Sequence, residues 1–143
     1  MKNKMKLVLA ALLALTMAFA LAGCGKPSLQ DWYNKNQSEF QEIEDSVNAQ
    51  SASMGCTLKL YVEDGNALVF AYTLLDDYAV DTSVDGALDS LASIYDSMFD
   101  QQTATFSELR TEVLKETSTE DVIIRLIALN PDGTELYSRD FTE

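Results

Sequence analysis

Histidine is absent from the sequence of 143 residues, and only two cysteines are present. Without imidazole the chain has no Ser-His-Asp triad, no His-ligated zinc and no imidazole acid–base catalysis. An enzyme built from this sequence would have to use carboxylates, Lys, Tyr or Ser, and no S-x-x-K or G-x-S-x-G motif occurs. We therefore expect a protein that is not an enzyme and that uses no cofactor.

Basic residues are also scarce, because 10 Lys and Arg stand against 23 Asp and Glu, a net charge of −13. Removing residues 1–23 takes away three lysines and no acid, so the remaining 120 residues carry −16. Nucleic acid and anionic head groups repel such a surface, so neither is an expected partner. The charge serves solubility, or it attracts cations and basic partners. A chain of this length forms one domain with its own core.

The chain opens with a basic segment and a short apolar run. Lys2, Lys4 and Lys6 precede residues 7–22, where Thr16 is the only polar side chain. This order is typical of a secretory signal peptide. As a helix the run would span about 24 Å, which is short for a stable transmembrane segment.

The apolar run ends in Leu-Ala-Gly-Cys, residues 21–24, which resembles the bacterial lipobox. The resemblance implies a diacylglycerol on the Cys24 thiol and cleavage just before this residue. Two acyl chains make a stable anchor, whereas a single chain binds a membrane only marginally. The alternatives are an ordinary signal peptide whose cleavage site contains Cys, or an uncleaved anchor. We expect the mature protein at the extracytoplasmic face of the bacterial cell membrane.

These features divide the chain into three parts. Residues 1–23 are the predicted lipoprotein signal peptide, residues 24–27 the lipidated N-terminus and tether, and residues 28–143 a single α+β domain. Once Cys24 is lipidated, Cys56 has no cysteine to pair with, so neither a disulfide nor a cysteine metal cluster is expected.

An acidic loop at 76–86 is the remaining candidate for a metal site. Its spacing, D-D-x-x-x-D-x-x-x-D-G, lacks the alternating oxygen ligands and the distant Glu of a calcium loop. We predict no metal site and expect a solvated loop with a helix cap, although the sequence leaves cation binding by this loop open.

Two stretches of the mature chain resemble one another. The segments 38–47 and 104–113 share apolar residues at i, i+3 and i+7, and 63–70 aligns with 131–138 around an Asp-Gly turn. Both matches occur in the same order, which favours a tandem helix–strand–strand repeat.

The pattern predicts a two-layer α+β sandwich, a four-stranded antiparallel sheet with helices on one face. Helices are expected at 28–52 and 87–116, the second with a break near 102–105, and strands at 57–63, 67–75, 121–129 and 134–141. Leu91, Ile94 and Met98 belong to the apolar stripe expected to meet the sheet.

Strand alternation places an unusually apolar set of side chains on the sheet face away from the helices. The candidate interaction face consists of Tyr61, Val69, Arg125, Tyr137, Arg139 and Phe141, accompanied by Ile123 and Ile127. Two alternatives remain open. Loop or C-terminal segments cover this face, or the isoleucines lie on a central strand that is buried on both sides.

The lipobox, the segment EDGNALVFAYTL and the segment NPDGTELYSRDF together resemble a known family. It is a family of small secreted lipoproteins of Gram-positive bacteria, catalogued as domain of unknown function 4854. The resemblance covers most of the mature chain, and NPDGTELYSRDF (130–141) is its most specific part. It implies an extracytoplasmic lipoprotein and supplies no catalytic motif.

Two functions therefore compete. The first is a non-enzymatic binding or accessory module, held to the membrane through the diacylglycerol on Cys24, which contacts an unknown protein or envelope ligand. The alternative is a cation or small-ligand receptor lipoprotein, although one domain lacks the two lobes with which such receptors usually enclose a ligand.

Overall fold

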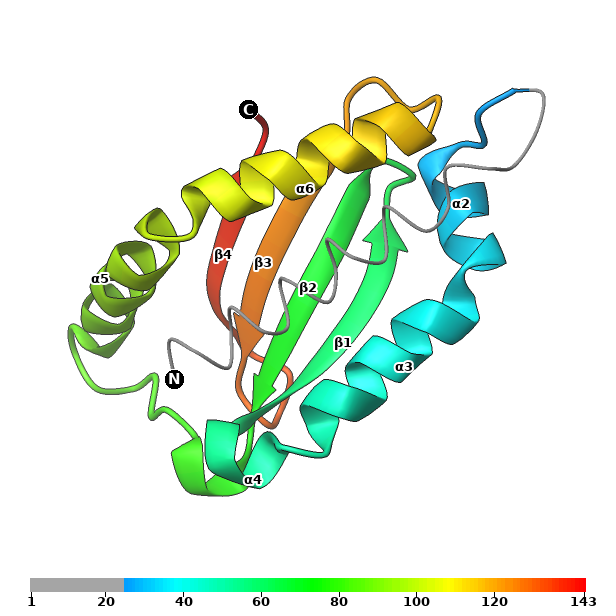
Figure 1. Ribbon diagram of the computed structural model, residues 1–143. Coiled ribbons are helices and arrows are strands. Elements are labelled where there is room, and N and C mark those ends of the chain that lie inside the picture. The colour runs from blue at the N-terminus through cyan, green and yellow to red at the C-terminus, as the bar shows by residue number, and fades with distance from the viewer. Residues whose placement is uncertain (1–24) are drawn as a thin grey trace.

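The computed structural model describes residues 25–143. Within this range five α-helices and four β-strands form one layer of helices and one sheet (Figure 1). The predicted signal peptide and Cys24 lie outside the described residues. None of the helices described is both long and apolar enough to cross a membrane.

The first predicted helix is divided into three. They are α2 (Leu29–Lys35), α3 (Gln37–Asn48) and α4 (Ser51–Met54). Ser28 caps α2, because its Oγ accepts a hydrogen bond of 3.2 Å from the backbone N–H of Asp31. Gly55 ends α4 with a φ of 77°, a left-handed conformation that favours glycine.

The strands and the second helical stretch lie close to their predicted positions. The strands are β1 (Cys56–Glu63), β2 (Ala67–Leu74), β3 (Ile123–Leu129) and β4 (Glu135–Phe141). Between the two hairpins the chain forms the 3₁₀ turn η1 (Asp76–Tyr78), α5 (Ala87–Asp100) and α6 (Thr103–Glu116). The break between α5 and α6 falls at Gln101 and Gln102, beside the predicted position.

The prediction of a wholly antiparallel sheet is wrong. The strand order is β1-β2-β3-β4, and β2 pairs with β3 in parallel, so the sheet is mixed. Each hairpin is antiparallel as expected. The connection through α5 and α6 returns the chain to the end of the sheet where β2 begins, which makes β3 parallel to β2. The tandem repeat stays a prediction.

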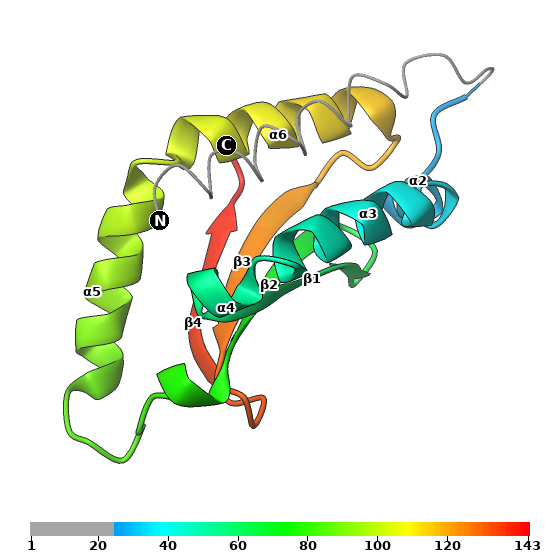
Figure 2. The ribbon, with the colours of Figure 1, turned by 60° about the horizontal axis from the view of Figure 1, so that its bottom comes forward.

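All five helices pack against one face of the sheet, as Figures 1 and 2 show. The main core cluster joins residues of these helices to side chains from every strand. A second, smaller cluster on the opposite face contains strand residues only: Ala67, Val69, Ala71 and Ile127, with Tyr61, Ile123 and Leu129 packed around them. The two-layer arrangement with one uncovered sheet face is therefore confirmed for the described residues.

An aromatic group occupies the centre of the main core. Phe106 on α6 is fully buried, and the centroids of three rings lie 4.6 to 6.3 Å from its own: Phe70, Phe99 and Phe141. These rings belong to β2, α5 and β4, so a single side chain of α6 joins both hairpins to the helix layer. Aromatic pairs at such distances add stability beyond their burial alone.

Side chains of the first helices bond to the outer edge of β1. Asn48 donates to the carbonyl oxygen of Leu58 at 3.2 Å and accepts from its N–H at 2.7 Å. The buried Glu44 accepts from the N–H of Leu60 at 2.6 Å, and the hydroxyl of Tyr33 donates to the carbonyl oxygen of Leu60 at 2.7 Å. These bonds satisfy backbone groups that an edge strand would otherwise present to solvent or to another chain.

Candidate functional site

Half of the predicted interaction face lies on the uncovered side of the sheet. Tyr61, Val69 and Arg125 stand side by side, because Tyr61 pairs with Val69 across β1 and β2 and Val69 pairs with Arg125 across β2 and β3. Val69 is fully buried although no helix covers this face. Its longer neighbours shield it. The alternative in which the two isoleucines lie on a strand buried on both faces holds for Ile127, which is buried, but not for Ile123, which is only half-buried.

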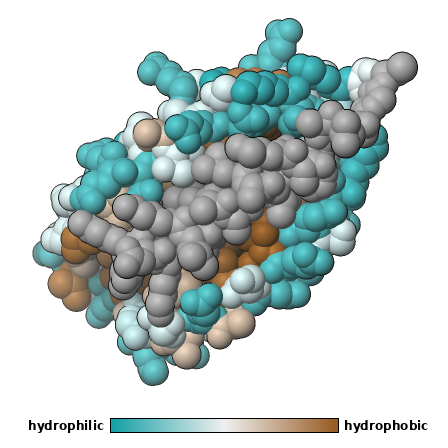
Figure 3. Space-filling view, viewed as in Figure 1, coloured by the Kyte–Doolittle hydropathy of each residue, from teal (hydrophilic) through white to brown (hydrophobic). Residues whose placement is uncertain are grey.

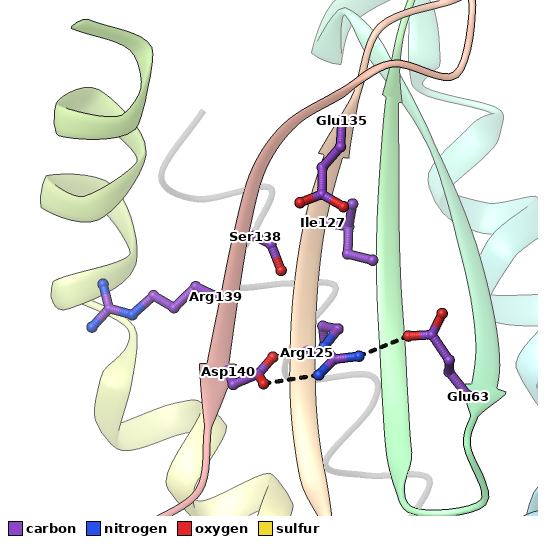
Figure 4. A pocket seen from close by; sticks show the side chains of 7 residues that line it. All are labelled: Glu63, Arg125, Ile127, Glu135, Ser138, Arg139 and Asp140. Atoms are coloured by element: carbon purple, nitrogen blue, oxygen red, sulfur yellow. Dashed lines mark hydrogen bonds and ion pairs between the residues drawn. The ribbon is translucent and has the colours of Figure 1, made fainter. Parts of the chain in front are cut away.

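Arg125 is held by two carboxylates at the centre of this face (Figure 4). Its Nη1 donates to Glu63 at 2.7 Å, and its Nε and Nη2 donate to the two oxygens of Asp140 at 2.7 and 2.9 Å. The hydrogen bonds to Asp140 and then Glu63 raise the pKa of Arg125 above its ordinary value. A guanidinium already paired in this way has little capacity to bind an external anion.

The other three residues of the predicted interaction face lie on the side of the sheet that the helices cover, so this part of the prediction is wrong. Tyr137, Arg139 and Phe141 point toward the helices, where Tyr137 donates to Asp96 at 2.6 Å and Arg139 bonds Asp100 at 2.8 Å. Figure 4 shows Arg139 extending toward α5, away from Arg125. Phe141 stacks on the core ring of α6. These three side chains attach β4 to α5 and α6.

The cause is a β-bulge near the start of β4. Ala128 pairs with Tyr137 but Leu129 pairs with Glu135, so Leu136 is an extra residue in β4. A bulge interrupts the regular alternation, and both Leu136 and Tyr137 join the main core. From this point onward the alternation is the reverse of the one expected from the sequence.

The acidic loop has the structure of a solvated turn. Asp81 accepts from the N–H and the hydroxyl of Ser83 at 3.0 and 2.6 Å, and these bonds lower the pKa of this exposed carboxyl. Across residues 25–143, no three Cys, Asp or Glu side chains are grouped as a metal site would require. Cation binding by this loop stays untested.

The sequence did not predict an apolar cavity of about 290 Å³ between α4, α5 and the sheet. Its main lining side chains are Met54, Cys56, Tyr72, Leu74, Leu91, Ile94, Tyr95, Met98 and Tyr137. None of the described residues that line it carries a charge. Figure 3 shows apolar surface in brown between the helices and along α5 on this side of the molecule.

The cavity exists because α5 is only partly seated on the sheet. Of its 14 residues only Phe99 is buried, and Ile94, predicted to lie against the sheet, is 64% exposed. The second half of α5 is fixed to β4 through Asp96 and Asp100. The apolar residues of α5 that were predicted to belong to the core thus form one wall of the cavity. The sequence signal that could have predicted the cavity is that α5 carries more apolar side chains than the sheet can cover.

Two tyrosines that line this cavity differ in the hydrogen bonding of their hydroxyls. The hydroxyl of Tyr137 is bonded to Asp96, and burial followed by this bond raises its pKa to about 12. The hydroxyl oxygen of Tyr72 is buried and has no hydrogen-bond partner among the described residues. Burial raises the pKa of Tyr72 and that of Cys56 above their ordinary values, so both are protonated near neutral pH.

Comparison with protein families supplies one match. Residues 29–141 match the family described as Domain of unknown function (DUF4854). The chain belongs to this family. The DUF4854 match spans α2 through β4, so it includes the cavity and the uncovered sheet face. No curated protein and no solved structure matches the chain.

Proposed function

We propose that this protein is a non-enzymatic binding module, lipid-anchored at the extracytoplasmic face of a Gram-positive cell membrane, and that its apolar cavity holds a small ligand. The lipobox supports the location, and the lack of histidine supports a role without catalysis. The cavity carries the ligand part of the proposal. Ligand pockets are mostly apolar hollows of about 300–1,000 Å³ with a few polar groups, and this cavity lies at the lower end of that range.

The uncovered sheet face is a second candidate, as the surface for a protein partner. It is favoured by the apolar group of Tyr61, Ile123 and Leu129 around the smaller cluster. This second candidate is weakened because three of the six residues predicted for this face lie on the side of the sheet that the helices cover. The hydrogen bonds of Arg125 to Asp140 and Glu63 also leave its guanidinium little capacity to bind a partner on this face.

The anchor is tested by replacing Cys24 with serine. We expect the wild-type chain in the membrane fraction and Cys24→Ser outside it, because serine cannot accept the diacylglycerol through a thioether. The measurement is fractionation with mass determination of the mature N-terminus. Cys56→Ser is the matched control and should stay with the membrane. Membrane retention of Cys24→Ser after signal-peptide removal would refute the anchor.

The cavity is tested with an apolar fluorescent probe, 2-dimethylaminonaphthalene. Residues 25–143 contain the sheet, its helices and both core clusters, so this domain is assayed without its lipid. We expect binding to wild type and at least a tenfold weaker affinity for Leu91→Trp, whose larger side chain fills the cavity from α5. Fluorescence titration gives both values.

Tyr61→Ser is the control for this titration, because Tyr61 lies on the opposite face of the sheet. Its affinity for the probe should equal that of wild type. If Tyr61→Ser abolishes binding and Leu91→Trp does not, the uncovered face is the ligand site instead. Absence of binding to wild type would reject the cavity as a receptor site.

A further inference from the structure

The unpaired hydroxyl of Tyr72 is the most unusual polar group in the described part of the chain. Tyr72 lies on β2, on the same side of that strand as Phe70, and its side chain lines the cavity. Nearly all buried polar side-chain atoms in native proteins have a partner in protein, water or ligand. A buried hydroxyl without one costs free energy, so this group calls for an explanation.

The other polar groups of the cavity do not supply that partner. The Tyr137 hydroxyl is already bonded to Asp96 at 2.6 Å. Cys56 is the neighbouring polarisable group on β1, but a protonated thiol is only a weak hydrogen-bond acceptor. Tyr72 therefore keeps an unused hydrogen-bond donor on a side chain that lines the cavity.

Charge further restricts what the cavity accepts. No charged side chain is among the described residues lining it, and moving an ion into such surroundings without a counter-ion is costly. Carboxylate and phosphate groups face a second barrier, since residues 24–143 carry a net charge of −16. A neutral molecule has neither the cost of burying a charge in this cavity nor the repulsion from the acidic domain.

Size sets the remaining limit. The cavity of about 290 Å³ has roughly twice the volume of an apolar cavity of about 150 Å³ that takes up benzene. We infer that it binds a neutral, largely apolar molecule of one or two rings, or an aliphatic equivalent, whose carbonyl or ether oxygen accepts a hydrogen bond from Tyr72. This inference rests on the proposed function, because it requires a ligand in the cavity.

Three matched probes test the inference on the domain of residues 25–143. They are 2-dimethylaminonaphthalene, its 6-acetyl derivative, and the derivative with a carboxylate in place of the acetyl group. We expect wild type to bind the acetyl probe most tightly and the carboxylate probe most weakly. Tyr72→Phe should weaken binding of the acetyl probe about 3- to 10-fold, the usual worth of one neutral hydrogen bond, and leave the unsubstituted probe unchanged.

Emission supplies a readout that does not depend on affinity. Because a hydrogen bond to the carbonyl shifts the emission of the acetyl probe to longer wavelength, the probe bound to Tyr72→Phe should emit at shorter wavelength than when bound to wild type. Tyr61→Phe is the matched control, because it removes a tyrosine hydroxyl on the opposite face of the sheet. Its affinity for the acetyl probe and the emission of the bound probe should both match wild type.

The outcomes separate the two proposals. Equal affinity and equal emission for Tyr72→Phe and wild type would overturn the role of Tyr72 and indicate that water satisfies its hydroxyl, while cavity binding would stand. Binding of the carboxylate probe as tight as that of the acetyl probe would overturn the neutral ligand class. Failure of wild type to bind any of the three probes would overturn this inference and the proposed receptor function together.

Discussion

Replacing Phe106 with alanine should lower the free energy of unfolding by about 3–5 kcal/mol, a large share of the stability of a domain of this size. The ring is fully buried, and it contacts aromatic rings from β2, α5 and β4. Its removal leaves a cavity where three elements meet, and none of them can collapse into it without losing its own contacts. Urea unfolding followed by circular dichroism measures the change.

Tyr78→Ala is the matched control for this substitution. Tyr78 is also aromatic, but it is 54% exposed, so its loss should cost less than about 1 kcal/mol. A cost for Phe106→Ala no greater than that of the control would mean that the aromatic group is not the centre of the core.

The second large effect is expected at Glu44, where alanine should cost about 2–3 kcal/mol. The carboxylate is buried and accepts a hydrogen bond of 2.6 Å from the N–H of Leu60, so truncation leaves that donor without its partner. Its ion pair with Lys59 is long, 3.9 Å, and the lysine is exposed, so this pair contributes little. Chemical unfolding of the domain measures the loss.

Two further variants isolate the cause. Glu44→Gln keeps an acceptor oxygen of the same reach and should recover most of the lost stability. Glu42→Ala removes an exposed glutamate from the same helix and should be close to neutral. If glutamine is as destabilising as alanine, the negative charge of Glu44 matters more than its hydrogen bond to β1.

Local signals predicted the elements of this fold well. The Asp64-Gly65 turn, where both residues have positive φ, and the turn at Gly133 mark the two hairpins as expected. The pairing between the hairpins could not be predicted in the same way. Nothing within β2 or β3 specifies a parallel neighbour, because that contact depends on where the long connection through α5 and α6 returns the chain.

The site was predicted less well, for two physical reasons. The extra residue Leu136 places Tyr137, Arg139 and Phe141 on the opposite face of the sheet from the one predicted. The alternation of apolar and polar residues along a strand does not show where such a bulge occurs. The cavity depends on how far α5 stands from the sheet, which follows from the attachment of Asp96 and Asp100 to β4. Helical periodicity identifies an apolar stripe on α5, but it does not show how much of that stripe is buried against the sheet.

The hydrogen bonds from α3 to β1 also limit how copies of this protein can associate. Addition of strands from other molecules requires free backbone groups at a sheet edge, and Asn48 and Glu44 occupy those groups in the middle of β1. Sheet extension is thereby restricted to the β4 side. If two molecules paired through their β4 strands, both outer edges of the combined sheet would be β1 strands whose backbone groups are already bonded. No further molecule could add a strand, so a dimer could form in this way but a fibre could not. A sheet that can be extended at one edge only is protected against polymerisation.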